Sequence, residues 1–328
     1  MMEKFDVPVV LIIFRRVEST LRVLERISSV KPNKLYILSD QGRTDVEKDM
    51  VEKCRSAVEN AINWDCEVVK DYAMENRGVY ENIALGVKRV FEVEDRAIVL
   101  EDDNLPETSF FWFCKKVLEY HEHNENVLWV CGTNYLENYS SNEDYLFTKN
   151  MMPCGWASWS KKFNKYYDDK FDAIDVRSNL KKIKNSYLYR PLFKQDLMNW
   201  LDEKYRWQEY GKPSSWDYQM SLTMRAFDLY AIVPTLNQIK NIGFDNLATH
   251  GGNDLSQEMT KRFCNLKTKE IIFPIRNNNF ISVNKDFEIK LAKIITYPKS
   301  MRYKRYLARL LKMALGMSVD KSFKEMFK

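Results

Sequence analysis

Short apolar strands alternate with amphipathic helices over the first 135 residues, and this alternation constrains the fold more than any other feature of the sequence. Strands are expected at residues 7–14, 34–39, 66–70 and 97–100, and helices at 19–30, after a capping box at 44–47, and at 80–91. Strand–helix–strand units with short connections form doubly wound sheets. The sequence therefore predicts an α/β, Rossmann-like fold in which helices flank a mostly parallel central sheet.

The fourth predicted strand ends at three consecutive carboxylates, Glu101, Asp102 and Asp103. Ligands of open α/β sheets bind at the carboxyl ends of the strands. Adjacent carboxylates repel one another, so a hard cation such as Mg²⁺ or Mn²⁺ stabilises them, and such cations commonly bridge to phosphate oxygens. The cluster suggests a metal-dependent phosphate-ester site. The alternative is an acidic N-cap of the helix expected to begin near Thr108.

Several function classes are disfavoured by what the sequence lacks. No GxGxxG follows the first strand and there is no Walker lysine loop, which argues against a dinucleotide dehydrogenase or an ordinary ATPase. No apolar segment approaches the roughly 18 residues of a membrane span. We identify no signal peptide, and the six cysteines form no CxxC pair, so they are expected to be reduced thiols of a cytoplasmic protein.

Positive charge is concentrated at the C-terminal end. Residues 290–328 contain eleven Lys and Arg and two acidic residues, so the net charge of this segment is +9. Because the net charge of the whole chain is +5, the remaining residues have a net charge of −4. Cations and bulky apolar residues alternate at helical spacing over residues 301–313. Such a helix can lie on an anionic membrane surface. The alternative is a helix packed on the body with a solvated basic face. No nucleic-acid-binding motif accompanies the charge.

The domain organisation is expected to be one continuous domain with an appendage. No linker-like stretch interrupts residues 1–280, although the sequence becomes more polar and aromatic after residue 135. Helices are expected near residues 180–203 and 216–227, with a strand at 229–233. The prediction is a nucleotide-sugar-binding half at 1–135, an acceptor half at 136–280, and a basic amphipathic tail at 281–328.

Seven short motifs then carry a resemblance to a known family. They are PVVLIIFRR at 8–16, SDQG at 39–42, NRG at 76–78, EDD at 101–103, GWA at 155–157, WD at 216–217 and NIGF at 241–244. Their order and spacing resemble those of nucleotide-sugar glycosyltransferases of the GT-A fold. The most similar members are bacterial surface-polysaccharide transferases related to animal N-acetylglucosaminyltransferase I. The resemblance covers most of residues 7–250.

The resemblance implies a role for each residue of the acidic cluster, which corresponds to a variant of the family's DxD motif. Its last carboxylate, Asp103, would bind Mn²⁺ or Mg²⁺, which in turn holds the nucleotide diphosphate. Glu101 and Asp102 would face the ribose or the sugar. A departing diphosphate develops negative charge, and a metal stabilises that charge.

Three further residues are implied to bind the donor. Arg16 would contact phosphate, although the family usually has Asn-Arg-Pro where this chain has Arg15-Arg16-Val17; a surface ion pair is the alternative. Asp40 would accept a hydrogen bond from a uracil N–H, or else form a turn before Gly42. Arg77, in front of the third helix, would contact a phosphate or a sugar hydroxyl.

An aromatic residue and a carboxylate are implied in the second half. Trp156 is expected at the donor sugar or the acceptor, whereas Trp159 is expected in the core. Asp217 corresponds to the general base that deprotonates the acceptor hydroxyl in an inverting displacement. The relatives have two consecutive aspartates where this chain has Asp217-Tyr218, and an N-cap is the alternative role.

His250 is the third implied residue of the second half, as a second metal ligand. Its alternative is a structural or solvent-exposed histidine. His121 and His123 are expected on an exposed helix.

Together these observations predict a metal-dependent, inverting glycosyltransferase that moves a sugar from a UDP-sugar, of GlcNAc or Gal type, to a glycan or lipid-linked glycan in surface polysaccharide synthesis. It would act in the cytoplasm, peripherally at the inner membrane face. Two alternatives stay open: a nucleotidyltransferase that forms nucleotide sugars, and a non-catalytic glycan-binding module. The first would typically have a Gly-rich basic loop after the first strand, which is absent.

Overall fold

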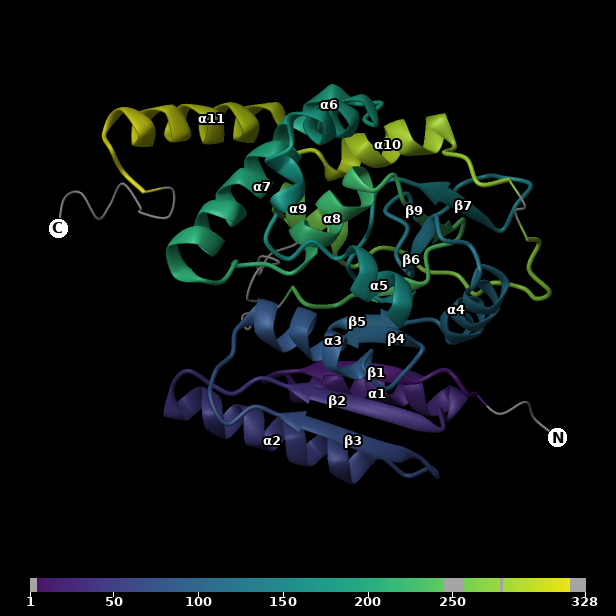
Figure 1. Cartoon of the computed structure of the whole chain (residues 1–328). Helices are drawn as coiled ribbons and strands as arrows, with labels where there is room; N and C mark the ends of the chain where they lie inside the picture. Colours follow the sequence, from purple (N-terminus) through teal and green to yellow (C-terminus); the bar gives the residue numbers. More distant parts are fainter. Residues whose placement is uncertain (1–4, 245–255, 278–279, 319–328) are drawn as a thin grey trace.

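The computed structural model describes residues 5–244, 256–277 and 280–318. Its centre is an eight-stranded sheet with the order β3-β2-β1-β4-β8-β6-β9-β7, and β5 and β10 form a second, two-stranded sheet (Figure 1). The strands are β1 (Val9–Ile13), β2 (Lys34–Ser39), β3 (Glu67–Tyr72), β4 (Arg96–Glu101), β5 (Asn104–Pro106), β6 (Val127–Cys131), β7 (Tyr145–Thr148), β8 (Trp156–Trp159), β9 (Tyr230–Pro234) and β10 (Ile239–Asn241).

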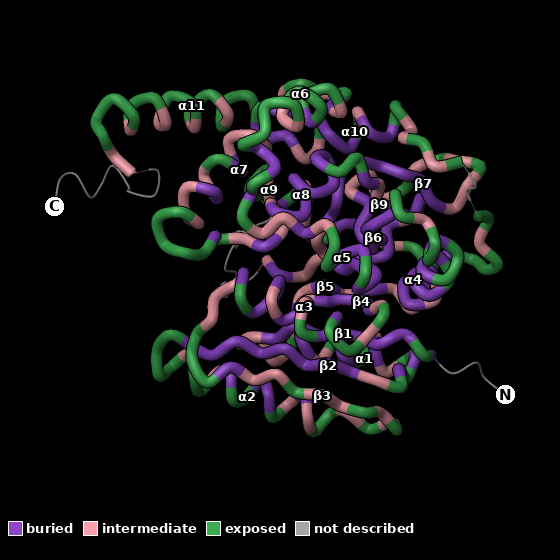
Figure 2. The backbone as a smooth tube through the Cα atoms, viewed as in Figure 1, coloured by how far each residue is buried: buried purple, intermediate pink, exposed green. Residues whose placement is uncertain are grey.

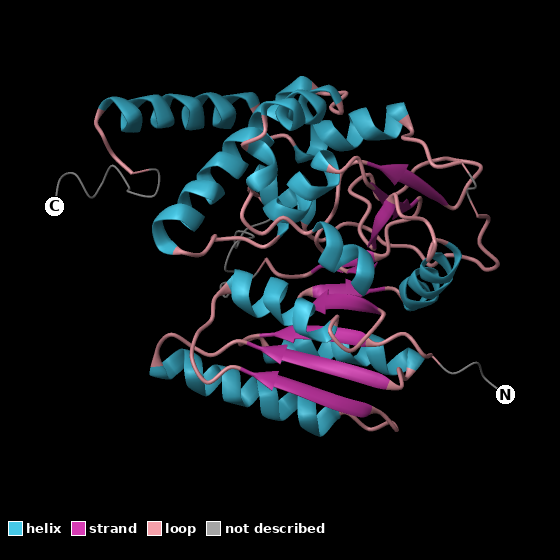
Figure 3. Cartoon of the chain, viewed as in Figure 1, coloured by secondary structure: helices cyan, strands magenta, loops and turns pink. Residues whose placement is uncertain are grey.

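The central sheet is mostly parallel, as predicted. Strands β3, β2, β1 and β4 are parallel neighbours, and β6 is parallel to β9. Strand β8 is antiparallel to both β4 and β6, so β4 and β6 share one direction, and β7 is antiparallel to β9. Six strands therefore run one way and two run the other. The predicted α/β class, a mostly parallel sheet flanked by helices, is confirmed (Figure 3).

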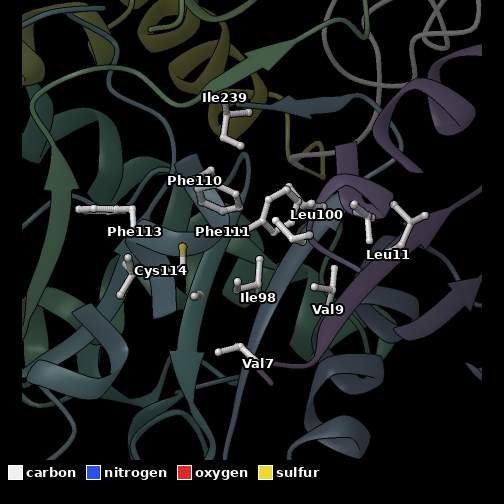
Figure 4. Close-up of a cluster of buried hydrophobic side chains, with 14 of the residues drawn as sticks. Val7, Val9, Leu11, Ile98, Leu100, Phe110, Phe111, Phe113, Cys114 and Ile239 are labelled. Carbon is white, nitrogen blue, oxygen red and sulfur yellow. The ribbon is translucent and has the colours of Figure 1, made fainter. Parts of the chain in front are cut away.

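The two faces of the sheet bury separate hydrophobic clusters, because side chains alternate along each strand. Val9 and Leu11 face a cluster that includes α1 (Val17–Val30), α2 (Asp45–Ala61) and α4 (Thr108–Tyr120), part of which is drawn in Figure 4. Val10 and Ile12 face the other cluster, which includes residues 80–90. The remaining helices are α5 (Ser160–Tyr166), α6 (Arg177–Asn185), α7 (Arg190–Tyr210), α8 (Asp217–Ala226), α9 (Glu258–Phe263), α10 (Lys285–Ile295), α11 (Lys299–Ala314) and the short η2 (Asp172–Ile174).

Two predicted helices differ from the observed ones. The helix expected at 80–91 begins as a π-helix, η1 (Tyr80–Leu85), and continues as α3 (Gly86–Val90). The helix expected at 180–203 is two helices, α6 and α7, because Pro191 lies in the first turn of α7. Proline has no backbone N–H to donate to the preceding turn and is tolerated only in the first turn of a helix, so α6 cannot continue through Pro191 and a new helix begins beside it.

The predicted tail is only partly an appendage. Phe287 and Leu291 of α10 are buried in the body, and Glu288 forms a buried ion pair with Arg225 at 3.1 Å. The segment that projects is therefore α11, which has no buried residue, rather than the whole of 281–328. Among the described residues, the helices are too short or too polar to cross a bilayer.

Candidate functional site

The carboxyl ends of β1, β2 and β4 open onto a cavity of about 940 Å³, at the edge where open α/β sheets bind ligands. Seven of the predicted site residues line it: Arg16, Asp40, Arg77, Glu101, Asp102, Asp103 and Asp217. Trp156 does not line this cavity, and His250 lies outside the described residues. The fold thus brings most of the predicted set to one place.

The acidic cluster is held at the cavity by the end of β1. One oxygen of Asp103 accepts a hydrogen bond from Arg16 at 2.9 Å, and its other oxygen accepts one from Asn104 at 2.6 Å. Asp102 accepts from the backbone N–H of Phe14 at 3.2 Å and lies 3.8 Å from Arg16. Asp102 therefore joins two strand ends, while Asp103 holds Arg16 in the cavity.

The cluster is not the N-cap of α4, which was the alternative interpretation. Strand β5 lies between the cluster and α4, and the residue before the helix is Glu107. The first two backbone N–H groups of α4 donate instead to the carboxylate of Glu270, at 3.1 and 2.8 Å. The helix terminus is thus satisfied from elsewhere, and the three carboxylates belong to the cavity.

Among the described residues, the charges that act on Glu101 are mostly negative. Burial raises the pKa of Glu101 well above its usual value, and the charges of Asp103, Asp102 and Asp217 raise this pKa further. Arg16 lowers the pKa of Glu101, but its effect is smaller than that of the carboxylates. A ligand or ion that brings positive charge is therefore favoured here.

The donor set fits a hard cation that also binds phosphate. Carboxylate oxygens are the ligands that Mg²⁺ and Mn²⁺ prefer, and such sites commonly use one or two carboxylates, completed by phosphate oxygens and water. No group of three or more His, Cys, Asp or Glu side chains is arranged as a metal cage within the part of the chain that the structure describes. Asp103 lines the cavity, where its carboxylate accepts from Arg16 and Asn104, and its role as a metal ligand stays a prediction.

The NIGF segment passes directly over Asp103. Pairing of β10 with β5 sets Asn241 opposite Asn104, and the N–H of Ile242 donates to the carbonyl of Asp103 at 2.8 Å. A Cβ at Gly243 would lie 1.9 Å from a carboxylate oxygen of Asp103 and 2.8 Å from the Arg16 guanidinium. Only glycine allows this close approach without displacing the carboxylate.

Asp40 clamps a loop of the cavity wall. Its carboxylate accepts four hydrogen bonds, from the side chain of Asn76 and the backbone N–H groups of Gln41, Arg77 and Gly78, between 2.7 and 3.0 Å long. A carboxylate offers about four lone-pair sites, so this one is fully used. Asp40 therefore positions this loop, while its contact with the base stays a prediction; Gly78, at φ +80°, lets the loop turn.

Arg77 lies on the rim with its guanidinium engaged. It donates to Asp71 at 2.8 Å, and Asp71 also accepts from Arg89. The side chain lines the cavity from this position.

Trp156 is a correction to the sequence prediction. Its side chain is 1% exposed and stacks on Trp129 with a centroid distance of 3.9 Å. The cause is its strand: β8 lies between β4 and β6 in the middle of the sheet, where both faces are covered. Trp159 is buried as expected, and the tryptophan that lines the cavity is Trp216.

Asp217 is the first residue of α8, after the N-cap position at Trp216. It lines the large cavity and also a second cavity of about 210 Å³. The second cavity is bounded by aromatic and polar side chains, among them Tyr135, Asn150, Asp196, Tyr218 and Tyr297. Burial raises the pKa of Asp196 to about 7, and the Tyr187 hydroxyl donates to this carboxyl at 2.7 Å. Asp217 thus lies where the two cavities meet.

Glu203 is a cavity residue that sequence reasoning missed. Its side chain is 2% exposed and accepts from the N–H and hydroxyl of Ser214 and from the N–H of Ser215. This carboxylate therefore shapes the loop that leads into Asp217. No local pattern reveals it, because its partners lie eleven residues away across a turn.

The side-chain oxygens of Asn82 and Ser215 are buried at the cavity and have no hydrogen-bond partner among the described residues. Buried polar atoms of this kind call for a partner, which a bound ligand or water would supply.

Comparisons with known proteins give only distant similarities. No family model and no curated protein matches the chain. A UDP-glucose pyrophosphorylase structure with UDP-glucose is 9% identical with a TM-score of 0.36, covering 72% of this chain and 93% of that chain. A 4-diphosphocytidyl-2C-methyl-D-erythritol synthase from Anaerococcus prevotii is 12% identical with a TM-score of 0.31, covering 50% and 75%. HddC from Yersinia pseudotuberculosis is 13% identical with a TM-score of 0.24, covering 43% and 57%. Similarities this remote do not bear on activity.

Proposed function

We propose that the protein is a metal-dependent, inverting glycosyltransferase that moves a sugar from a UDP-sugar, of GlcNAc or Gal type, to a glycan in surface polysaccharide synthesis. The observation that carries the proposal is the position of Asp217, at the junction of two cavities and within electrostatic reach of the acidic cluster. A transfer between two bound substrates needs such a residue between their sites.

The larger cavity is proposed to bind the donor. Asp103 would hold Mn²⁺ or Mg²⁺, which would neutralise the charge that develops on the departing diphosphate. Arg16 lies beside Asp103 and can donate to a phosphate oxygen. Arg77, which lines the cavity, would contact the donor, and the hydrogen bonds of Asp40 to the 76–78 loop would keep the cavity wall in shape.

The smaller cavity is proposed to bind the acceptor. Tyr135, Tyr218 and Phe263 offer apolar ring surfaces to a sugar, while Asn150 and Asp196 offer hydrogen-bonding groups. Asp217 would accept the proton of the attacking acceptor hydroxyl. The base would then lie on one side of the transferred sugar and the diphosphate on the opposite side. This arrangement suits a single displacement with inversion.

The donor is tested with a panel of nucleotide sugars and Mn²⁺. We expect one UDP-sugar to raise the thermal unfolding midpoint and to be hydrolysed slowly without acceptor, since water can replace the acceptor hydroxyl. Formation of UTP from a UDP-sugar and pyrophosphate would indicate a nucleotidyltransferase instead. Absence of both stabilisation and turnover across the panel would point to a glycan-binding module.

The base is tested with Asp217→Asn. Donor stabilisation should be retained, because the amide has nearly the same size, while transfer and donor hydrolysis should fall by about 10²–10⁴-fold, the usual contribution of a general base. Asp202→Asn, also at the cavity but bound to Arg309, is the matched control and should keep most activity. Unchanged turnover in Asp217→Asn would remove the base from this residue.

The proposed location is the cytoplasm, at the inner membrane face. Such a position suits an enzyme whose acceptor is a lipid-linked glycan.

A further inference from the structure

Helix α11 carries six cations and no acidic residue, and several of the cations face the body. Arg302 donates to the carbonyl of Tyr297 at 3.1 Å, Arg305 to Asn199 at 3.0 Å and Arg309 to Asp202 at 2.7 Å. The contacts of Arg305 and Arg309 tie α11 to α7, beside which it lies in Figure 1. The helix is packed on the body, as in the expected alternative, but its arginines face the body instead of the solvent.

The outward face of α11 is apolar. Residues at helical spacing are widely exposed there: Tyr303 (65%), Tyr306 (52%), Leu307 (41%), Leu310 (44%) and Leu311 (55%). We call these five residues the α11 stripe. Figure 2 draws α11 without any buried segment. A surface helix of a water-soluble domain normally turns its apolar stripe inward, so an outward stripe indicates a surface that something else covers.

We propose that the α11 stripe inserts into the interfacial region of an anionic lipid bilayer. Lys299 and Lys304 lie on the same exposed side, and neither forms an ion pair with any residue that the structure describes. Exposed lysines at the edges of an apolar stripe can reach anionic headgroups while the stripe enters the acyl boundary. A second copy of the chain is a poorer occupant, because it would bring two helices of six cations together.

The bilayer would then lie beside the donor cavity. Arg305 itself lines that cavity, as do its partner Asn199 and the Arg309 partner Asp202. Binding through α11 therefore fixes how far the cavity stands from the lipid surface. One consequence of this arrangement rests on the proposed function: a lipid-linked acceptor could reach Asp217 without leaving the membrane.

Membrane binding is tested by flotation of the full chain with vesicles. We expect binding to vesicles of equal parts phosphatidylcholine and phosphatidylglycerol, weakening with salt, and little binding to phosphatidylcholine alone. Leu307→Gln with Leu310→Gln should weaken binding by about tenfold or more, because two leucines that would enter the lipid are lost. Lys299→Gln with Lys304→Gln should weaken it by about fivefold per lysine.

The matched control is Met74→Gln with Val93→Gln, which removes exposed apolar side chains (86% and 71% exposed) far from α11 in sequence. It should bind vesicles like the unaltered chain, and all variants should keep the same unfolding midpoint. The proposal is overturned if the unaltered chain does not float or if the control weakens binding equally. It is also overturned if ultracentrifugation without lipid shows a dimer that the Leu307 and Leu310 changes dissolve. Donor hydrolysis without vesicles tests the proposed function separately.

Discussion

Asp103 and Arg16 share the most consequential contact of the cavity, since one carboxylate oxygen of Asp103 is bound by the guanidinium. If Asp103 held a divalent cation, as proposed, Arg16 would share or give up this oxygen and could donate to a phosphate oxygen of the donor instead. On that proposal, cation binding and donor binding would be coupled through this pair.

Asp103→Asn tests this coupling. The amide keeps the shape but is a poorer cation ligand, so metal-dependent donor stabilisation should be lost and turnover should fall by about 10²–10³-fold. The unfolding midpoint without ligand should change little, because the cavity holds excess negative charge. Asp49→Asn, in an exposed pair with Lys53, is the matched control. Full metal-dependent activity in Asp103→Asn would contradict the assignment.

Gly243→Ala should damage the site more than the fold. The added Cβ would push the Asp103 carboxylate and the Arg16 guanidinium, both ends of side chains, so we expect at least about a tenfold loss of donor affinity. Gly211→Ala gives the contrast: its φ of +69° strains an alanine, but nothing lies within 4 Å, so it should lower stability by about 1 kcal/mol and leave donor affinity unchanged. Ligand titration and denaturant unfolding of both variants separate the two effects.

At the scale of elements, the loop at 76–78 depends on a carboxylate from another strand end. Asp40→Asn replaces one acceptor oxygen with a donor, which then faces N–H groups of that loop. We expect a loss of about 1–3 kcal/mol in the free energy of unfolding and faster hydrogen exchange at Arg77 and Gly78. If Asp40 bound the base instead, donor affinity would fall while exchange at these amides stayed unchanged.

Local patterns predicted the elements that depend on local chemistry. Thr44 caps α2 as expected, with its side chain accepting from the N–H of Glu47, although Glu47 in turn accepts from the N–H of Arg43. The acidic cluster was located by the strand that precedes it. Roles set by tertiary neighbours were not predictable in this way. Trp156 is buried because β8 lies in the middle of the sheet, and Asp40 is occupied because a distant loop folds onto it.

At the scale of the whole molecule, the last two helices have opposite relations to the body. Both have cations and apolar residues at helical spacing, but α10 also has Asp286 and Glu288, whereas α11 has no acidic residue. The buried side chains of Phe287 and Leu291, together with the ion pair of Glu288 with Arg225, hold α10 in the body. The sequence therefore located the basic helix, but its outward apolar face depends on how its arginines meet α7.

The stability of the whole molecule should also depend on a buried histidine. His121, expected on an exposed helix, is 3% exposed at the end of α4, where its ring contacts the Tyr145 hydroxyl at 2.9 Å. Burial, and then the charge of Lys162, lowers the pKa of His121 from 6.5 to about 4. Between these two values the unfolded chain binds a proton at this residue and the folded chain does not. Stability present above pH 6.5 is therefore lost as the pH falls toward 4.

His121→Gln isolates this contribution, because glutamine can contact Tyr145 but does not titrate. The variant should be less stable than the unaltered chain at pH 7, and the difference should shrink as the pH falls toward 4. Asp196 acts in the opposite sense, since its raised pKa of about 7 costs stability as the pH rises from 4 to 7. The change in the free energy of unfolding caused by Asp196→Asn should therefore be more favourable at pH 7 than at pH 4. Denaturant unfolding of both variants between pH 4 and 8 measures how the free energy of unfolding changes with pH. If this free energy changed with pH in the same way in His121→Gln and in the unaltered chain, the histidine would not be the cause.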